Sequence, residues 1–144
     1  LITRNATTAG AEGGCQAEVG SASAMAASAA VELFGGTPRQ CMDAASFAMV
    51  NILGLVCDPI GGLVENPCQN RNAMGASNAL ISAELSLAGV KSITPIDETI
   101  GVMYAVGRSI PSELRETSLG GMAVAKSACE NCMACANKRN KMKK

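Results

Sequence analysis

Three cysteines lie in Gly- or Pro-rich turns of an otherwise alanine-rich chain that contains no histidine. They are Cys15 in AEGGCQAE, Cys57 in GLVCDPIGG and Cys68 in VENPCQNRNA. Cys15 and Cys68 each precede a predicted helix, where backbone N–H groups stabilise a thiolate, and glycine lets the main chain approach a bulky inorganic group. The pattern suggests a metal centre held by three thiolates. Three ligands would leave one coordination position open, which distinguishes a catalytic metal from a structural one.

Each cysteine taken alone has a simpler interpretation, as a small buried apolar residue. We interpret Cys41 in this way, because it lies inside a predicted helix, in RQCMDAA, with no glycine nearby. For the three turn cysteines we favour metal binding. Zinc is the main competitor, but zinc sites usually take closely spaced pairs such as C-x2–4-C. Cysteines this far apart in the sequence favour a larger cluster.

A second group of cysteines, Cys129, Cys132 and Cys135, forms a C-x-x-C-x-x-C pattern near the end of the chain. This spacing could hold part of an iron–sulfur cluster or a zinc ion. It lacks the fourth cysteine and the proline of the ferredoxin pattern. One of these thiols could instead reach the open metal position and block it. The closing KRNKMKK is interpreted as a solvated, disordered end.

The composition favours an all-α fold in which helices and Gly/Pro-rich loops position the turn cysteines. Alanine is the best helix former, aromatic residues make up 2% of the chain, and no sustained period-2 pattern predicts a strand. At 144 residues, the chain is one domain or a fragment of a larger one. We predict a helical domain over 1–126 and a Cys-rich, then basic, flexible tail over 127–144. The opening LITRNATTAG resembles the interior of a longer sequence, so we expect upstream residues.

Charge and hydropathy argue against two classes of partner. The formal net charge is zero, whereas a general nucleic-acid binder carries a basic face. No stretch reaches the roughly 18 apolar residues of a membrane span, and the N-terminus lacks a signal-peptide pattern. Seven cysteines without such a signal indicate a reducing compartment. We therefore expect a cytoplasmic protein that binds neither nucleic acid nor membrane.

Glycine and proline mark the predicted helix boundaries. Thr37 is a suitable N-cap, with Pro38 at the first helical position. The prolines and glycines of 56–68 predict a loop. The predicted helices cover 16–34, 38–55, 70–88 and 96–107, with a short helix or extended entry over 1–15 and a helical turn over 111–116.

Three long segments resemble the iron–sulfur-dependent L-serine dehydratases of bacteria. They are TTAGAEGGCQAEVGSASAMAA, NILGLVCDPIGGLVENPCQNRNAMGASNAL and IDETIGVMYAVGRSIPSELRETSLGGMA. The resemblance is to the C-terminal half of the α chain, or to the α domain of single-chain members, and covers nearly all of 6–124. It implies a helical domain that binds one 4Fe–4S cluster through Cys15, Cys57 and Cys68, with one iron free for substrate. It also implies the conversion of L-serine to pyruvate and ammonia.

The resemblance further implies partners and a division of labour. An upstream α segment and a β domain or β chain would complete the enzyme, and we expect an oligomer. Iron would act as a Lewis acid on the departing hydroxyl oxygen, while a base removes the Cα proton. No electron is transferred in this reaction, so the cluster would serve as an acid and not as a redox carrier.

Several polar residues near the turn cysteines are candidates for the remaining roles. Arg71 either pairs with the serine carboxylate, since a guanidinium suits bidentate binding, or pairs with Glu65 as a loop clasp. Asn66 and Asn72 could orient substrate or cluster. The acid/base candidates are Glu12 and Glu65. Surface or interdomain pairs are expected for Arg108, Glu113 and Arg115.

Two other functional classes stay open at this point. The tail cysteines could make the chain an electron-transfer protein. Zinc on the turn cysteines could make it a zinc-stabilised helical interaction module.

Overall fold

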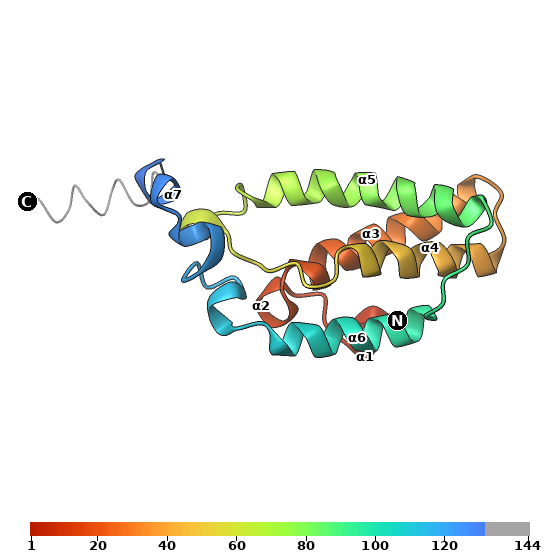
Figure 1. The fold of residues 1–144 in the computed structure, drawn as a ribbon, viewed down its shortest axis with the longest axis horizontal. Coiled ribbons are helices and arrows are strands. Elements are labelled where there is room, and N and C mark those ends of the chain that lie inside the picture. Colours follow the sequence, from red (N-terminus) through yellow and green to blue (C-terminus); the bar gives the residue numbers. More distant parts are fainter. Residues whose placement is uncertain (132–144) are drawn as a thin grey trace, which may run out of the picture.

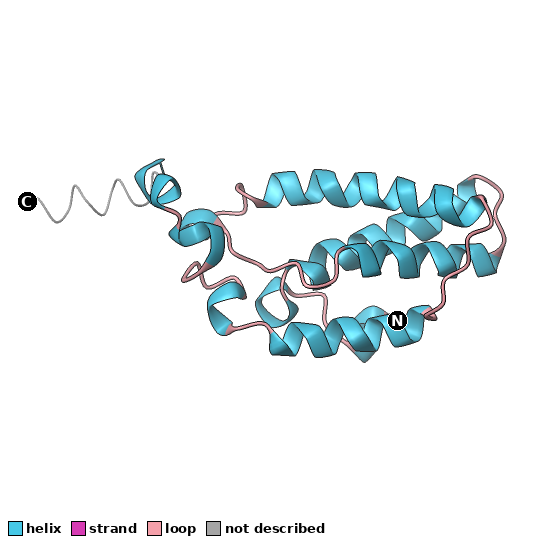
Figure 2. Cartoon of the chain, in the orientation of Figure 1, coloured by secondary structure: helices cyan, strands magenta, loops and turns pink. Residues whose placement is uncertain are grey.

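The fold is all-α, as the composition predicts. A computed structural model describes residues 1–131, apart from the side chains of Cys129 and Asn131. Within that range the only β pairing is an isolated bridge between Cys57 and Arg115 (Figure 2). The helices are α1 Ile2–Asn5, α2 Gly10–Gly13, α3 Cys15–Leu33, α4 Pro38–Asn51, α5 Cys68–Leu87, α6 Ile96–Ser109 and α7 Lys126–Asn131, with 3-10 turns η1 Ile60–Gly62, η2 Ser112–Leu114 and η3 Gly121–Val124.

Most of the long helices begin and end within two residues of their predicted bounds, but α4 does not. It ends at Asn51 and not at the predicted residue 55. Gly54 adopts a φ of +86°, which a continuing helix does not allow. Its N–H donates to Gln16 Oε1 (2.8 Å), so a contact from α3 replaces the last helical turn. The first residues of the predicted tail are also helical, since they form α7.

Helices α3, α4 and α5 pack against one another in an elongated bundle, and α6 closes the other side of α4 (Figure 1). The helices meet through small residues, which lets their backbones approach closely. At Gly75 the backbone of α5 lies so close to α3 that an added Cβ would be 2.6 Å from Val19 Cγ1. Larger side chains fill the remaining core: Val31, Met49, Ile100 and Met103 are fully buried.

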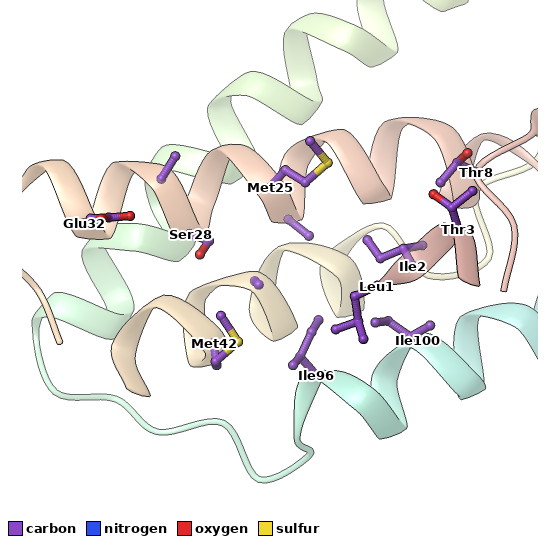
Figure 3. A pocket seen from close by; sticks show the side chains of 13 residues that line it. Leu1, Ile2, Thr3, Thr8, Met25, Ser28, Glu32, Met42, Ile96 and Ile100 are labelled. Atoms are coloured by element: carbon purple, nitrogen blue, oxygen red, sulfur yellow. The ribbon is translucent and has the colours of Figure 1, made fainter. Parts of the chain in front are cut away.

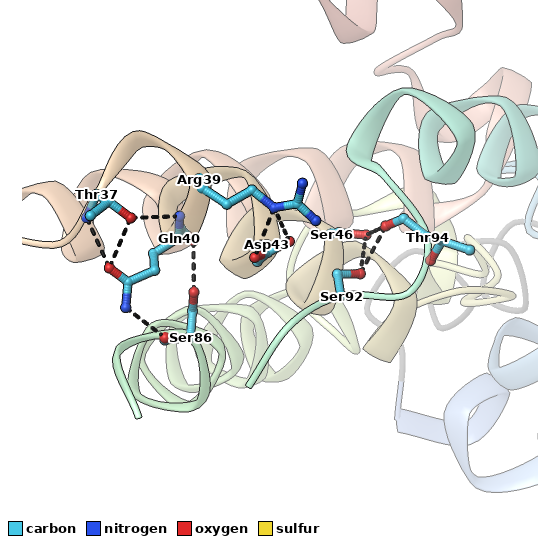
Figure 4. A network of polar contacts seen from close by, with 8 residues as sticks. All are labelled: Thr37, Arg39, Gln40, Asp43, Ser46, Ser86, Ser92 and Thr94. Atoms are coloured by element: carbon cyan, nitrogen blue, oxygen red, sulfur yellow. Dashed lines mark hydrogen bonds and ion pairs between the residues drawn. The ribbon is translucent and has the colours of Figure 1, made fainter. Parts of the chain in front are cut away.

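One end of the bundle is fastened by uncharged hydrogen bonds (Figure 4). Thr37 and Gln40 form a capping box at the start of α4, an arrangement that stabilises a helix by about 1 kcal/mol. Gln40 Nε2 then donates to the carbonyl of Ser86 (2.9 Å), and Ser86 Oγ donates to the carbonyl of Gln40 (2.8 Å). These bonds join the beginning of α4 to the end of α5.

A buried amide joins the three central helices at mid-length. Asn78 of α5 donates to Ser23 Oγ of α3 (2.9 Å) and to the carbonyl of Ala48 of α4 (2.8 Å). Its Oδ1 accepts from Asn51 Nδ2 (2.8 Å). Both amide donors and the oxygen are therefore used, as a buried polar group requires.

The opposite end of the bundle carries the turn cysteines. Here α3 and α5 begin, and the loop 52–67 meets the segment 110–125, at the left of Figure 1. None of the helices within residues 1–131 is both long and apolar enough to cross a membrane.

Candidate metal centre

Cys15 is the first residue of α3 and is almost fully buried, at 3% exposure. Gly14 precedes it with a φ of +77°, and a Cβ at Gly14 would lie 2.7 Å from the carbonyl oxygen of Leu55. Gln16 N donates to that same oxygen (2.9 Å). Glycine at position 14 is thus required for the start of α3 to lie directly on the loop that leads to Cys57.

Cys57 is held by its main chain. Its N–H donates to the carbonyl of Leu114 (2.8 Å), and its carbonyl accepts from Glu116 N (2.6 Å). Its side chain is 4% exposed and packs with Cys15, Val19 and Ile52 in a small apolar cluster. The structure therefore brings together two cysteines that are distant in sequence.

Cys68 is the first residue of α5 and is half-buried. Arg71, one helical turn later, reaches the other two cysteine segments. Its Nη1 donates to the carbonyl of Val56 (2.9 Å) and to Asp58 Oδ1 (2.5 Å), and lies 4.0 Å from Cys15 Sγ. Arg71 thus links the segment of Cys68 to those of Cys15 and Cys57.

The surroundings of Cys57 and Cys68 favour the neutral thiol. Burial raises the pKa of Cys57, and Cys15, Glu116 and Glu18 raise it further. Burial also raises the pKa of Cys68, with Cys15 and Glu18 adding to the effect, while Arg71 opposes it. Negative charge crowds around these sulfur atoms, so a cation placed among them would relieve the repulsion.

Arg71 is firmly cationic in this setting. Burial acts to lower its pKa, but the hydrogen bond and the charge of Asp58, followed by Cys15, outweigh burial and raise the pKa above its ordinary value. Arg71 pairs with the carboxylate of Asp58. The predicted pair of Arg71 with Glu65 is therefore wrong. Glu65 is exposed, whereas Asp58 is 2% exposed.

Glu18 and Glu116 are the acidic side chains that lie beside Cys57. A Cβ built on Gly10 would lie 3.1 Å from Cys57 Sγ, 3.3 Å from Glu18 Oε2 and 3.5 Å from Glu116 Oε2. Because residue 10 is glycine, a small space stays open between the thiol of Cys57 and the carboxylates of Glu18 and Glu116. Glu18 could have been inferred from the sequence, because it follows Cys15 by three positions on one helix. Glu116 comes from a distant segment and carried no such signal.

The predicted acid/base and orienting residues are more exposed to solvent than the three cysteines. Glu12 and Glu65 are exposed, as are Asn66 and Asn72. Asn72 Nδ2 donates to the carbonyl of Cys68 (2.9 Å), which places this amide on the first turn of α5. The acid/base role of Glu12 and Glu65 stays a prediction, and both side chains are open to solvent.

The remaining predicted residues divide between core, surface and undescribed chain. Cys41 lies in the helical core, as predicted. On the surface, Glu113 accepts from Ser112 Oγ (3.1 Å), and the pKa of Glu113 is lowered by its backbone hydrogen bond and by Ser112. Arg115 Nη1 donates to the carbonyl of Glu12 (3.4 Å), and Arg108 is exposed. Cys132, Cys135 and the basic KRNKMKK lie outside the described residues, as does the side chain of Cys129.

An apolar groove of about 390 Å³ lies away from the cysteines, where α1 meets α3, α4 and α6 (Figure 3). Ile2, Met25, Met42 and Ile100 line it, and Glu32 is its one acidic lining residue. No cysteine contributes to it. The chemistry suggested by the thiols therefore belongs to the other end of the bundle.

Comparison with known proteins finds a family model and several relatives that match most of the chain. The family described as "Serine dehydratase alpha chain" matches residues 1–123. The "L-serine dehydratase, alpha chain" of Peptoniphilus asaccharolyticus is 61% identical over 126 residues, which are 88% of this chain and 43% of that relative. The "Probable L-serine dehydratase, alpha chain" of Bacillus subtilis is 58% identical over 123 residues, 85% of this chain and 41% of that relative.

A third relative carries the matching region within a longer polypeptide. The "L-serine dehydratase" of Mycobacterium tuberculosis is 48% identical over 126 residues, which are 86% of this chain and 27% of that relative. The chain thus spans less than half the length of each of these three relatives.

Proposed function

The chain belongs to the serine dehydratase alpha chain family, and from that premise we propose that it carries the cluster-binding part of an iron–sulfur-dependent L-serine ammonia-lyase. The enzyme would convert L-serine to pyruvate and ammonia. Residues 1–126 would form the cysteine-bearing domain. A β chain or β domain, with further α sequence, would complete the enzyme, which we expect to be oligomeric.

One observation carries the proposal: Cys15 and Cys57, remote in sequence, pack against each other at the end of the bundle where Cys68 begins α5. Cys15 is one of the groups that raise the pKa of Cys68, and Arg71 contacts both neighbouring segments. The three thiols come from three different segments, and Gly10 and Gly14 allow the backbone to approach them closely. This arrangement supports binding of an inorganic group larger than a single metal ion.

The spacing of the ligands favours a cluster over a single zinc ion. Within residues 1–131, no group of three His, Cys, Asp or Glu side chains is gathered closely enough to hold one metal ion. A single zinc would need its sulfur ligands within about 4.6 Å of one another, because each Zn–S bond is about 2.3 Å. In a 4Fe–4S cluster each thiolate binds a different iron, so its ligands stand farther apart. Cys15 and Cys57 are in contact and Cys68 comes from a third segment, and this set of sulfur donors supports the cluster that the family resemblance implies.

The residues of the chain would hold and shield this group. Cys15, Cys57 and Cys68 would bind it as thiolates and lose their protons on binding. Arg71 would hold the three cysteine segments together, since its guanidinium is already engaged by Val56 and Asp58. When bound, the cluster supplies a Lewis acid for the leaving hydroxyl of serine. Burial of Cys15 and Cys57 would keep water from two of the three ligands.

Anaerobic reconstitution of the 144-residue chain with iron and sulfide tests the proposal. We expect both elements to be bound stoichiometrically, with the broad visible absorption of a 4Fe–4S centre. Cys15→Ser, Cys57→Ser and Cys68→Ser should each lose that absorption, whereas the matched control Cys41→Ser should keep it. With the partner β polypeptide added, pyruvate should form from L-serine. Absorption that survives all three substitutions, or binding of zinc alone, would contradict the proposal.

A further inference from the structure

Asp58 has a buried carboxylate whose two oxygens serve two different parts of the fold. Its side chain is 3% exposed. Oδ1 accepts from Arg71 Nη1 of α5 (2.5 Å), and Oδ2 accepts from the backbone N–H of Met122 in η3 (2.6 Å). We call this three-residue arrangement the Asp58 bridge. It begins one residue after Cys57, so it acts directly on the loop that carries that thiol.

On the C-terminal side of the bridge, the backbone of Gly121 lies directly against the side chain of Asp58. Gly121 has a φ of +59°, and a Cβ there would lie 2.8 Å from both Cβ and Cγ of Asp58. Glycine is thus required both by the backbone conformation and by the close approach. Ser118 Oγ donates to the carbonyl of Pro59 (2.6 Å), although Ser118 itself has a φ of +56°. A residue with a side chain keeps that conformation only where its surroundings hold it.

The α5 side of the bridge reaches the other thiols. Arg71 also contacts the carbonyl of Val56 and approaches Cys15 Sγ at 4.0 Å, and it lies three positions after Cys68. A buried carboxylate is costly unless it is paired and hydrogen-bonded. The pairing of Asp58 therefore requires both neighbouring elements to stay in place.

We propose that Asp58 is the positioning residue of the cysteine site: its carboxylate fixes the Cys57 loop simultaneously to α5 and to η3. The role of this placement in cluster binding rests on the proposed function, but the placement itself concerns the metal-free chain. Asparagine cannot replace the aspartate, because its amide offers one acceptor oxygen and, in either orientation, its nitrogen would face a donor, Met122 N–H or Arg71 Nη1.

The first experiment measures the alkylation of Cys57 by iodoacetamide in the metal-free 144-residue chain, with peptide mass spectrometry as the readout. Cys41 lies on α4 in the buried core of the bundle, so its alkylation rate reports global unfolding in the same sample. We expect Asp58→Asn and Gly121→Ala to raise the Cys57 rate by at least about tenfold relative to Cys41, because local opening exposes a buried thiol. Asp43→Asn is the matched control. Asp43 is also a buried aspartate paired with an arginine (Arg39), yet this substitution should leave the Cys57 rate unchanged.

Two results would overturn the proposal. One is a Cys57 rate that stays at the wild-type value in both variants. The other is a Cys41 rate that rises in step with Cys57 in both, since Asp58 would then stabilise the whole fold and not the cysteine loop.

A second readout connects the bridge to cluster retention. After anaerobic reconstitution, Asp58→Asn and Gly121→Ala should release iron to a chelator at least about tenfold faster than wild type and Asp43→Asn. A wild-type chain that takes up no iron would overturn the proposed function alone, because the alkylation experiment needs no metal. Wild-type release rates in both bridge variants would overturn the positioning role in the loaded protein.

Discussion

Arg71 Nη1 lies 2.5 Å from Asp58 Oδ1, and both side chains are largely withdrawn from water. Removing one partner of such a pair leaves the other charge buried and uncompensated. We expect Arg71→Ala to lower the free energy of unfolding of the metal-free chain by about 3–5 kcal/mol, measured by urea denaturation. Arg39→Ala is the comparison, since Arg39 pairs with Asp43 but is 70% exposed. Its loss should cost less than the loss of Arg71, because only Asp43 is buried in that pair and the arginine lies in water. Equal losses in the two variants would show that burial of the Arg71 pair has no energetic consequence.

Glycine at position 75 sets the distance between α3 and α5. Gly75→Ala should destabilise the fold by about 1–3 kcal/mol, because the new methyl group would overlap Val19 Cγ1 in a packed core. Gly101→Ala is the matched control in α6, where a Cβ would meet nothing within 4 Å. That substitution should stabilise the chain by about 0.4–1 kcal/mol. Thermal and urea unfolding measure both effects, and a stable Gly75→Ala variant would mean that α3 and α5 separate at little cost.

The raised pKa of Cys57 should be visible in its reactivity. Only the thiolate reacts with iodoacetamide, and the folded state favours the neutral thiol because its pKa lies above the reference value of 9.0. In metal-free protein, the alkylation rate of Cys57 should therefore still rise steeply above about pH 10, whereas the same thiol in urea should reach half its maximal rate near about pH 9 and level off above about pH 10. A rate that is half-maximal near about pH 9 in the folded chain would contradict the burial and the negative neighbours described for this residue.

The same shift has a consequence for stability. A thiol whose folded pKa is raised contributes its full stabilisation below the unfolded pKa and loses it as pH rises beyond that value. Between pH 9 and pH 10 the metal-free chain should lose stability, and Cys57→Ser should make that slope shallower. Urea denaturation at several pH values measures the slope. A slope that the substitution leaves unchanged would assign the alkaline loss to other groups.

The hydrogen-bonded cap at the start of α4 should contribute independently of the cysteine end. Thr37→Ala removes the acceptor for Gln40 N and should cost about 1 kcal/mol. Thr37→Ser keeps the hydroxyl and should cost only a few tenths. Iron uptake should be the same in both variants, because the cap lies at the far end of the bundle. Loss of uptake in Thr37→Ala would show that the two ends are coupled.

Local sequence signals predicted most of the helices, because their limits are set by residues that act on their own neighbours. Pro38 begins α4, and Gly35 follows the end of α3. The end of α4 was missed because it depends on Gln16, which belongs to another helix. Composition and spacing contain no information about a side chain that arrives from so far along the chain.

The candidate site divides in the same way. The cysteines were predicted from their turn settings and from the family resemblance, and the structure places Cys15 against Cys57. The carboxylates around them were not predicted. Proximity in sequence favoured Glu65 as the partner of Arg71. Arg71 instead pairs with Asp58, because the loop turns Asp58 inward and leaves Glu65 exposed. Glu116 and Met122 reach the site only through tertiary folding.

The main-chain pairing of Cys57 with Leu114 and Glu116 bears on the order of events during synthesis. The cysteine loop reaches its described shape only after the segment through Met122 has emerged from the ribosome. Until then Cys57 lacks the partners that bury it, and a nascent chain would present it to oxidants. Loading of any inorganic group is therefore expected to follow translation of the segment through Met122.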